Sequence, residues 1–396
     1  MNPDFLKYQA QTSAHPLGLE VAKAQGSYVY DTNGKAYLDF VAGVSACGLG
    51  HCHPAVVEAV REQAGRYMHV MVYGEFALEP AVTLSRELAE ALPAPLECTY
   101  LVNSGTEAME GAIKLARRVT GRTELISAYD AYHGNTLGSM SLMSYEARKA
   151  HYRPLMPGVR HIRFNHFEDL QQIGPRTAAV VLETIQGGAG FIVPVPGYLE
   201  AVRRRCDETG ALLILDEIQP GFGRTGRLFA FEHYHCVPDI VVVGKGMASG
   251  LPVGAFSASR AHMETLSAPK LGHITTFGGN PVIAAAALAT LRELRNTNLV
   301  KDTLEKEALF RKLLVHPLIE EVRGKGLMLA LMVREAALAD YIVLQAMEKG
   351  LLLFWLLFEP RAVRISPPLT LSEPEIREGC ALILEILESY PGPPVN

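Results

Sequence analysis

The sequence predicts an α/β protein whose main domain is a largely parallel sheet packed between helices. From Cys98 onward, short apolar runs alternate with helical patterns to give about seven strands, which is typical of βαβ units. The apolar runs are continuous rather than alternating, so each strand is expected to be covered on both faces. A length of 396 residues suggests two or three domains.

A hairpin and two helices are expected before this sheet. Asn33-Gly34 lies between alternating aromatic and apolar residues, which predicts a β-hairpin over residues 27–40. Pro54 takes the favoured first position of a helix that ends near residue 68. A second helix is expected over 79–92, where Pro93 closes it.

The strands of the sheet are predicted over residues 98–102, 124–128, 160–164, 177–183, 211–216, 240–244 and 252–258. Helices are expected between them, from Gly105 and over 197–209. From Pro281 the pattern is helical for a long stretch and then becomes mixed. This last part has strands over 326–333 and 362–365, helices over 336–349 and 373–389, and a frayed end over 391–394.

Composition argues against several kinds of partner. The net charge is −5 and no basic block occurs, so nucleic acid is not an expected partner. The most apolar runs, 282–291 and 351–358, are shorter than the roughly 20 residues of a membrane span, and the N-terminus lacks a signal-peptide core. Six cysteines without a repeated spacing do not make a disulfide framework, which favours a cytoplasmic protein.

Two of the predicted strands end on opposite charges, Asp216 and Lys245. Ligands of open α/β sheets bind at the carboxyl ends of the strands, and a buried charge without a partner is costly there. The glycines beside Lys245 allow close approach, and a buried lysine suits Schiff-base chemistry. The pair therefore predicts pyridoxal 5'-phosphate, attached to the lysine, with the acid at its ring nitrogen.

Two further motifs follow strands. Residues 103–108, Asn-Ser-Gly-Thr-Glu-Ala, open a helix, so Ser104, Gly105 and Thr106 form a candidate phosphate cup. Ser104 and Glu107 also have the spacing of a capping box, and both interpretations can hold. Tyr132, which precedes His133, lies at a strand end where an aromatic ring can stack on a cofactor.

Two other patterns carry less weight. Residues 221–226 match a dinucleotide fingerprint, but the preceding strand ends on acids well before the first glycine and no clear helix follows. The histidine and cysteine groups at 51–53 and 233–236 match no common zinc spacing, so no metal site is predicted.

Taken together, the motifs resemble the class III aminotransferases of the ornithine, acetylornithine and 4-aminobutyrate type, in the fold-type I pyridoxal-phosphate superfamily. Matching phrases occur in the family's order from residue 48 to Arg364, over nearly the whole chain. The resemblance implies a large cofactor-binding domain over 46–285 and a small α+β domain made from 1–45 and 286–396. It also implies a homodimer with shared active sites.

The resemblance gives the cofactor-binding residues separate roles. Lys245 forms the Schiff base and shuttles the substrate's α-proton, and Asp216 keeps the pyridine nitrogen protonated. Tyr132 stacks on the ring, with His133 beside it among the cofactor-binding residues. Gln219 bonds the phenolic oxygen of the ring.

The phosphate and the substrate have their own residues in this resemblance. Ser104, Gly105 and Thr106 bind the phosphate together with Thr276 of the neighbouring subunit. Arg364 pairs with a substrate carboxylate, which its planar fork suits.

Two positions depart from the family pattern. Asn135 stands where the acetylornithine, ornithine and 4-aminobutyrate enzymes typically have a second carboxylate-binding arginine. Gly188 stands where they usually have a glutamate that holds the carboxylate-binding arginine when a longer substrate enters. The amino donor and acceptor therefore stay open, with a monocarboxylate amino acid or an ω-amino compound among the alternatives.

The expected function is a ping-pong aminotransferase that moves an amino group from an amino acid to a 2-oxo acid. The first alternative is an amino-acid racemase or epimerase on the same scaffold, which also needs Lys245. A non-catalytic binding protein on this fold is a more remote alternative, because Lys245 and Asp216 are both present and no DNA-binding domain is added.

Overall fold

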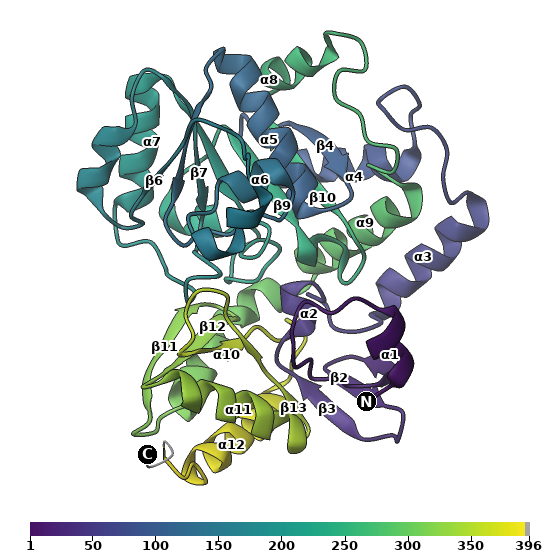
Figure 1. Cartoon of the computed structure of the whole chain (residues 1–396). Coiled ribbons are helices and arrows are strands. Elements are labelled where there is room, and N and C mark those ends of the chain that lie inside the picture. The colour runs from purple at the N-terminus through teal and green to yellow at the C-terminus, as the bar shows by residue number, and fades with distance from the viewer. Residues whose placement is uncertain (393–396) are drawn as a thin grey trace.

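The large sheet predicted from the sequence is present in a computed structural model, which describes residues 1–392 (Figure 1). Its strands have the spatial order β4-β10-β9-β8-β7-β5-β6. Their bounds are Cys98–Val102 for β4, Glu124–Ala128 for β5, Val159–Ile162 for β6, Thr177–Glu183 for β7, Leu212–Asp216 for β8, Ile240–Gly244 for β9 and Gly254–Ala258 for β10. The pairs from β6 through β9 are parallel, so these strands end at the same edge.

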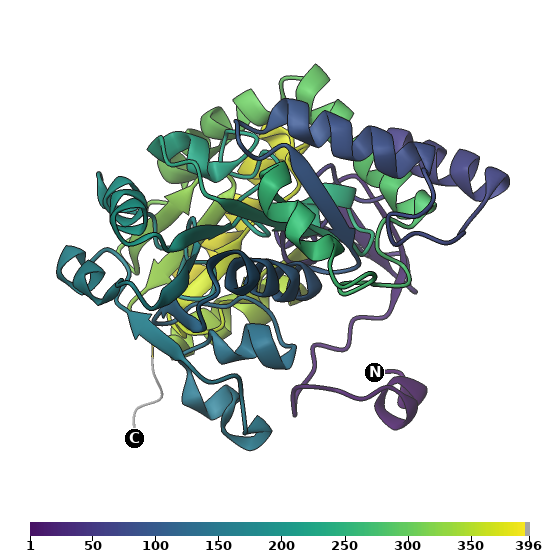
Figure 2. The same ribbon diagram turned by 90° about the horizontal axis from the view of Figure 1, so that it is seen from above.

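Helices cover both faces of this sheet, as the view from above shows (Figure 2). Ile214 of β8 belongs to one apolar cluster, which includes Met109 and Ile113 of α5 (Gly105–Thr120). Leu213 and Leu215 point the opposite way, because successive strand residues alternate in direction. They belong to the cluster that contains the apolar residues of α4 (Glu79–Ala91), α7 (Tyr198–Thr209) and α9 (Pro281–Asn296).

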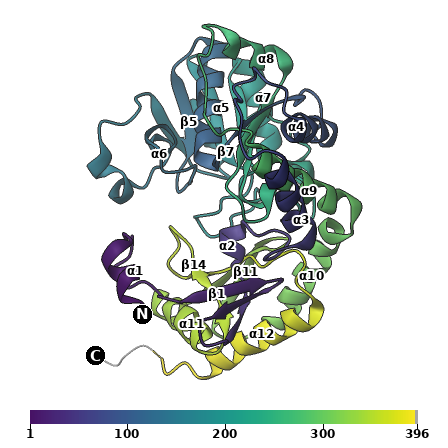
Figure 3. The same ribbon diagram turned by 90° about the vertical axis from the view of Figure 1, so that its right-hand side faces the viewer.

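Residues from both ends of the chain form a second body beneath this sheet (Figure 3). One four-stranded sheet contains β1 (Val21–Gln25), β2 (Tyr28–Asp31), β3 (Ala36–Asp39) and β13 (Leu351–Leu352). The other contains β11 (Ile319–Lys325), β12 (Met328–Val333), β15 (Ala362–Ile365) and β14 (Phe354–Trp355). Parallel pairing of β13 with β3 joins the C-terminal part to the N-terminal part.

The remaining helices connect or cover these sheets. They are α1 (Pro3–Tyr8), α2 (Ala42–Ser45), α3 (Pro54–Arg66), α6 (Leu137–Ser141), α8 (Arg260–Glu264), α10 (Leu299–Leu313), α11 (Ala336–Glu348) and α12 (Glu373–Glu388). Among the described residues, no helix is both long and apolar enough to cross a membrane.

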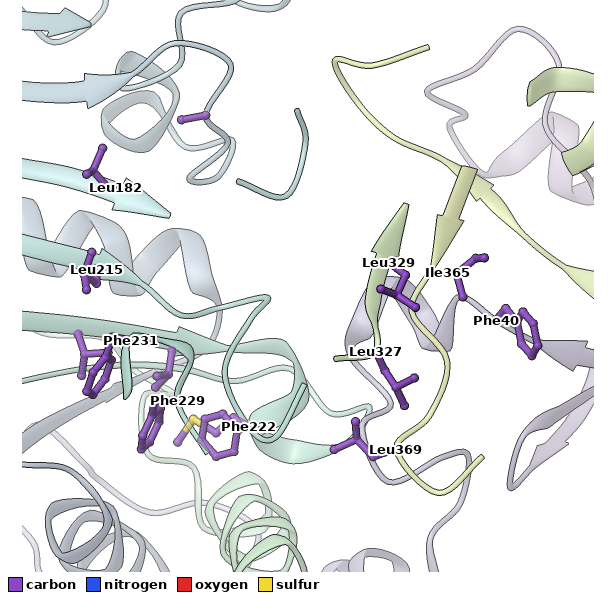
Figure 4. Close-up of a cluster of buried hydrophobic side chains, with 14 of the residues drawn as sticks. Phe40, Leu182, Leu215, Phe222, Phe229, Phe231, Leu327, Leu329, Ile365 and Leu369 are labelled. Carbon is purple, nitrogen blue, oxygen red and sulfur yellow. The ribbon is translucent and has the colours of Figure 1, made fainter. Parts of the chain in front are cut away.

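One apolar core continues from the large sheet into the second body (Figure 4). Leu182 and Leu215 of the large sheet lie on one side of it, and Leu329 and Ile365 of the second body lie on the other. Leu369 is fully buried between the two groups. The carboxyl edge of the large sheet is thereby held against the second body.

The predicted strands and helices of the large sheet are confirmed with small shifts in their ends. β6 begins at Val159 and ends at Ile162, and β10 begins at Gly254. The prediction of a largely parallel sheet is confirmed, and the exception is β10, which is antiparallel to both of its neighbours. The sequence analysis missed β1, β11, β13 and β14, which are short or mostly polar.

The long helical stretch after Pro281 is two helices, α9 and α10, separated by Thr297 and Asn298. The predicted domain boundary between residues 285 and 286 lies inside α9. The frayed end is predicted over residues 391–394. Residues 393 and 394 of that range lie outside the described residues, as do 395 and 396.

Candidate active site

Three charged side chains lie together at the carboxyl edge of the large sheet. Glu183 ends β7 and is the register partner of Asp216, which ends β8. Asp216 also pairs in register with Val242 of β9, and Lys245 follows directly after that strand. Parallel pairing therefore brings two acids and one amine, which are far apart in sequence, to one edge.

The Asp216 carboxylate is held by two polar groups. Its Oδ2 lies 2.8 Å from Nδ1 of His133, and its Oδ1 accepts a hydrogen bond from the backbone N–H of Ile218 at 3.0 Å. His133 is buried, which by itself lowers the pKa of the imidazole, but the hydrogen bond and charge of Asp216 outweigh this and raise it. The buried imidazole is therefore the side-chain partner that holds the Asp216 carboxyl group in place.

Lys245 lies at the edge of the sheet, where the sequence predicts the amine that binds the cofactor. Its backbone has φ +42°, a left-handed conformation that non-glycine residues rarely adopt. Burial, and next the positive charge of Arg364, lower the pKa of Lys245 to about 8. Roughly a tenth of this amine is then uncharged at pH 7, far more than at the ordinary lysine pKa, and proton transfer and nucleophilic attack require this form.

The N-terminus of α5 contains the three residues of the predicted phosphate cup. Ser104 caps the helix, because its hydroxyl accepts a hydrogen bond from the N–H of Glu107 at 3.3 Å. The carboxylate of Glu107 bonds the N–H of Asn103 at 2.7 Å rather than that of Ser104, so the predicted capping box is not closed. Gly105 and Thr106 follow in the first helical turn, where backbone N–H groups have no intrahelical acceptor.

Two glycines allow the close packing around this helix end. A Cβ at Gly105 would lie 2.7 Å from Cδ1 of Ile218, and a Cβ at Gly134 would collide with the Thr106 side chain. Gly134 also has φ +129°, which disfavours a side chain at that position. Tyr132 and Gly134 can therefore approach α5 closely.

Glu183 is a buried acid that connects two loops of the site. Its carboxylate accepts hydrogen bonds from the N–H groups of Tyr132 at 3.1 Å and Gly187 at 2.9 Å. Burial raises the pKa of Glu183 to about 7. The sequence analysis missed this residue, although the rule that selected Asp216, a charge at the end of a continuous apolar strand, applies to it equally.

A left-handed turn from the N-terminal part of the chain completes this side. Residues 42–45 have φ values of +49°, +60°, +62° and +66°, an uncommon run for three residues other than glycine. Ser45 accepts a hydrogen bond from Nε2 of Gln219 at 3.3 Å. Val44 of the same turn faces the space above Lys245.

Arg364 reaches the site from β15 of the second body. Its side chain is 4% exposed, and burial lowers the pKa of the guanidinium to about 10, so it stays cationic at neutral pH. The guanidinium lies 5.4 Å from the ring centre of Phe191. Nε and Nη1 have no hydrogen-bond partner among the described residues.

These side chains line one cavity of about 430 Å³ between the large sheet and the second body. Of the ten residues predicted from the sequence, those in its wall are Gly105, Thr106, Tyr132, His133, Asp216, Gln219, Lys245 and Arg364. Ser104 and Thr276 are not in the wall. Thr276 is exposed, and its hydroxyl lies 3.4 Å from that of Tyr73.

The cavity wall also contains residues that the sequence patterns did not single out. They are Val44, Glu183, Ile218, Pro220, Phe354, Trp355 and Leu357. Over residues 1–392, no group of three or more His, Cys, Asp or Glu side chains is arranged to hold a metal ion.

Comparisons with known proteins agree with this geometry. An acetylornithine aminotransferase from Caldanaerobacter subterraneus subsp. tengcongensis is 38% identical, over 96% of this chain and 97% of its own length. A putrescine aminotransferase from Pectobacterium atrosepticum is also 38% identical, over 97% of this chain and 85% of its own. Neither supports the racemase alternative.

A solved structure of ornithine aminotransferase from Toxoplasma gondii, described with partial occupancy of pyridoxal phosphate at its active site, has the same fold. The TM-score is 0.91 at 32% identity, over 97% of this chain and 92% of that one. Residues 8–387 match the family described as aminotransferase class-III. The chain belongs to the class-III aminotransferase family.

Proposed function

We propose that this cavity transfers an amino group from an amino acid to a 2-oxo acid, in two half-reactions that share pyridoxal 5'-phosphate. The family uses this cofactor, and the chemistry of the wall suits it. The observation that carries the proposal is the placement of Lys245 and Asp216, an amine and an acid from neighbouring strands, in the wall of one cavity.

The residues present match the parts of the cofactor. Lys245 is the residue that would hold it covalently, and Asp216 would keep its ring nitrogen protonated. Gly105 and Thr106 would bind its phosphate at the positive end of α5. Tyr132 and Gln219 would contact its ring. When bound, the cofactor supplies an electron sink for the substrate's α-carbon.

The chain's own groups provide binding and proton transfer. With a pKa near 8, Nζ of Lys245 can take up and return the α-proton of the substrate at neutral pH. His133 holds the carboxyl group of Asp216 in position through their 2.8 Å contact. Arg364 would bind a substrate carboxylate through its unpartnered N–H groups. The apolar residues 354–357 would exclude water.

A homodimer belongs to the same proposal. The hydroxyl of Thr276 lies 3.4 Å from that of Tyr73, and the two segments that contain these residues have exposed apolar side chains, namely Met68, Val70, Met71, Phe76, Leu271, Ile274 and Phe277. The ring of His69 lies 4.8 Å from that of Phe277, so the two segments form a single patch. A patch of this kind is typical of a protein interface. It would bring Thr276 to the phosphate site of the partner.

Two further assignments stay proposals. The pairing of β3 with β13 supports a small domain formed by residues 1–45 and the segment that begins at α10. All six cysteines are free thiols, which supports a reducing, cytoplasmic location.

The test is a panel of amino donors and oxo-acid acceptors added to the holoenzyme, with the cofactor absorbance and the oxo-acid product followed. We expect the absorbance to change and the oxo acid to be released with at least one donor, and Lys245→Ala to abolish turnover. Full activity in Lys245→Ala would refute the mechanism. Exchange of the α-proton with inversion and no oxo-acid release would indicate racemisation instead.

A further inference from the structure

The charge balance of the cavity wall bears on which substrates fit. In the part of the wall that this chain supplies, the lysine and arginine side chains are Lys245 and Arg364, the acids are Glu183 and Asp216, and the imidazole of His133 contacts Asp216. Lys245 is needed for the reaction and Asp216 is paired with His133. Arg364 is therefore the cation available to a substrate.

The surroundings of Arg364 position its guanidinium to bind one carboxylate. It extends from β15, between Ala330 of β12 and Phe354 of β14, and its side chain stacks on Phe191. No acid of the described chain lies within ion-pair distance of it, and two of its nitrogens are orphaned. Arg364 and Lys245 line the same cavity, and the charge of Arg364 contributes to the lowered pKa of Lys245. A bound carboxylate would then lie next to the reacting carbon.

The wall beside Arg364 is apolar. Phe354, Trp355 and Leu357 come from one segment of the second body, and Val44 comes from the left-handed turn. No lysine or arginine of the described chain other than Lys245 and Arg364 lines the cavity. A second carboxylate on the substrate would therefore meet apolar groups, the two acids or neutral polar groups such as Asn135, and no second lysine or arginine of the described part of this chain.

The contact of Gly188 with Phe358 holds this segment in place. The N–H of Phe358 donates to the carbonyl of Gly188 at 2.9 Å. A Cβ at residue 188 would lie 2.8 Å from two ring carbons of Phe358, so the ring occupies the space that a side chain there would need. The Tyr145 ring packs on the other side, with ring centres 5.3 Å apart. The apolar segment is thereby held against the loop that contains Gly188.

We propose that the substrates of both half-reactions are monocarboxylic α-amino acids and 2-oxo acids with an uncharged, apolar side chain. This inference rests on the proposed aminotransferase function and names its substrate class. A dicarboxylate would leave one charge unpaired, and an amine without a carboxylate would leave the buried guanidinium unpaired. Either mismatch lowers kcat/KM by about 10- to 100-fold.

The first test compares 4-methyl-2-oxopentanoate with 2-oxoglutarate as acceptors for the holoenzyme. We expect the monocarboxylate to have the larger kcat/KM by about tenfold or more. Leu357→Arg adds a cation to the apolar wall. It should lower the ratio of kcat/KM for the monocarboxylate to kcat/KM for 2-oxoglutarate, or bring it below one. The matched control Leu344→Arg, on the exposed side of α11, should leave the ratio unchanged.

Arg148 provides a sharp counter-test, because its guanidinium lies 5.8 Å from the Phe358 ring centre, outside the cavity wall. If 2-oxoglutarate equals or exceeds the monocarboxylate, the proposal is overturned. If, in addition, Arg148→Gln removes that activity, the second carboxylate binds at Arg148.

The second test measures binding without turnover. Trp355 is the single tryptophan of the chain and lies in the cavity wall, so its fluorescence reports occupancy. In the holoenzyme, 4-methylpentanoate should change the Trp355 fluorescence at a lower concentration than glutarate, and neither compound carries an amine that could react. Equal or reversed affinities would contradict the substrate class. If no amino acid of any class yields an oxo acid, the aminotransferase function itself fails, whatever the binding order.

Discussion

At the level of single residues, the site is a set of buried charges whose surroundings set their protonation. Asp216 has His133 as its partner, Glu183 has two backbone N–H groups, and Lys245 is desolvated. Arg364 is left with two nitrogens that have no hydrogen-bond partner among the described residues, and Nε2 of His133 in the same wall also lacks one. A buried cation of this kind destabilises the fold and is useful only when a ligand arrives.

Replacing Arg364 by methionine should therefore separate stability from activity. We expect Arg364→Met to raise the free energy of unfolding by about 1–2 kcal/mol, because the desolvated guanidinium is removed while its apolar volume is kept. The same variant should lose most of its kcat/KM for carboxylate substrates. Calorimetry of the substrate-free holoenzyme, together with steady-state kinetics, measures both. A lower melting temperature would show that Arg364 has a partner we have not identified.

At the level of elements, the left-handed turn of α2 depends on groups outside it. Oδ1 of Asp39 accepts hydrogen bonds from the N–H groups of Val41 at 2.7 Å and Ala42 at 2.9 Å. Oδ2 of the same carboxylate lies 2.8 Å from Nε2 of His51. The hydrogen bond to Asp39, and next one to Cys47, raise the pKa of His51 to about 10. The imidazolium is thus a support for the turn that carries Val44 and Ser45.

The stability contributed by His51 should depend on pH with a definite sign. A base whose pKa is raised in the fold stabilises fully below its unfolded value near 6.5, and this contribution is lost as pH rises through about 10. The free energy of unfolding of the wild type should exceed that of His51→Gln by about 2 kcal/mol at pH 6, and this difference should shrink toward pH 10. Denaturant unfolding at several pH values measures it. A difference that grows with pH would contradict the assignment.

Glycine positions in two helices make a second prediction at this level. A Cβ at Gly111 of α5 would collide with the Phe256 ring of β10, whereas a Cβ at Gly65 of α3 meets no atom within 4 Å. Gly111→Ala should therefore destabilise the protein by about 1–3 kcal/mol through overpacking. Gly65→Ala should stabilise it by about 0.5 kcal/mol through helix propensity. Thermal unfolding of the two variants should shift in opposite directions, and a shift in the same direction would refute the packing argument.

At the level of the whole molecule, one chain does not bring Thr276 to its own cavity. The proposed dimer can be tested by complementation between two defective subunits. A mixed dimer of Lys245→Ala and Thr276→Ala subunits has one site with both native residues, so co-expression should recover activity above that of either variant alone.

The control for this experiment is a mixed dimer of Lys245→Ala and Asp216→Asn subunits. These two residues lie in the same cavity of one chain, so neither site is intact and no recovery is expected. Equal recovery in the two mixtures would rule out a shared site. Sedimentation should also give twice the chain mass of 43.2 kDa.

Local sequence patterns account for much of this structure. Continuous apolar runs, helix-opening prolines and an Asn-Gly turn predicted β4, β5, β7 and α3 within two residues, because burial and backbone preference act over short distances. The rule that ligands meet strand ends also selected Asp216 and Lys245. The same local rules could not show that β10 runs antiparallel, since pairing direction depends on contacts distant in sequence.

The sequence by itself determined the strands and helices of the large sheet and the chemistry of the amine and acid at its edge. Only the tertiary structure decided what surrounds that pair: Glu183 through strand register, Val44 through a left-handed turn, and the apolar segment 354–358 fastened at Gly188. The physical reason is that charge and periodicity are properties of neighbouring residues. The shape and polarity of a cavity arise where segments remote in the chain pack together.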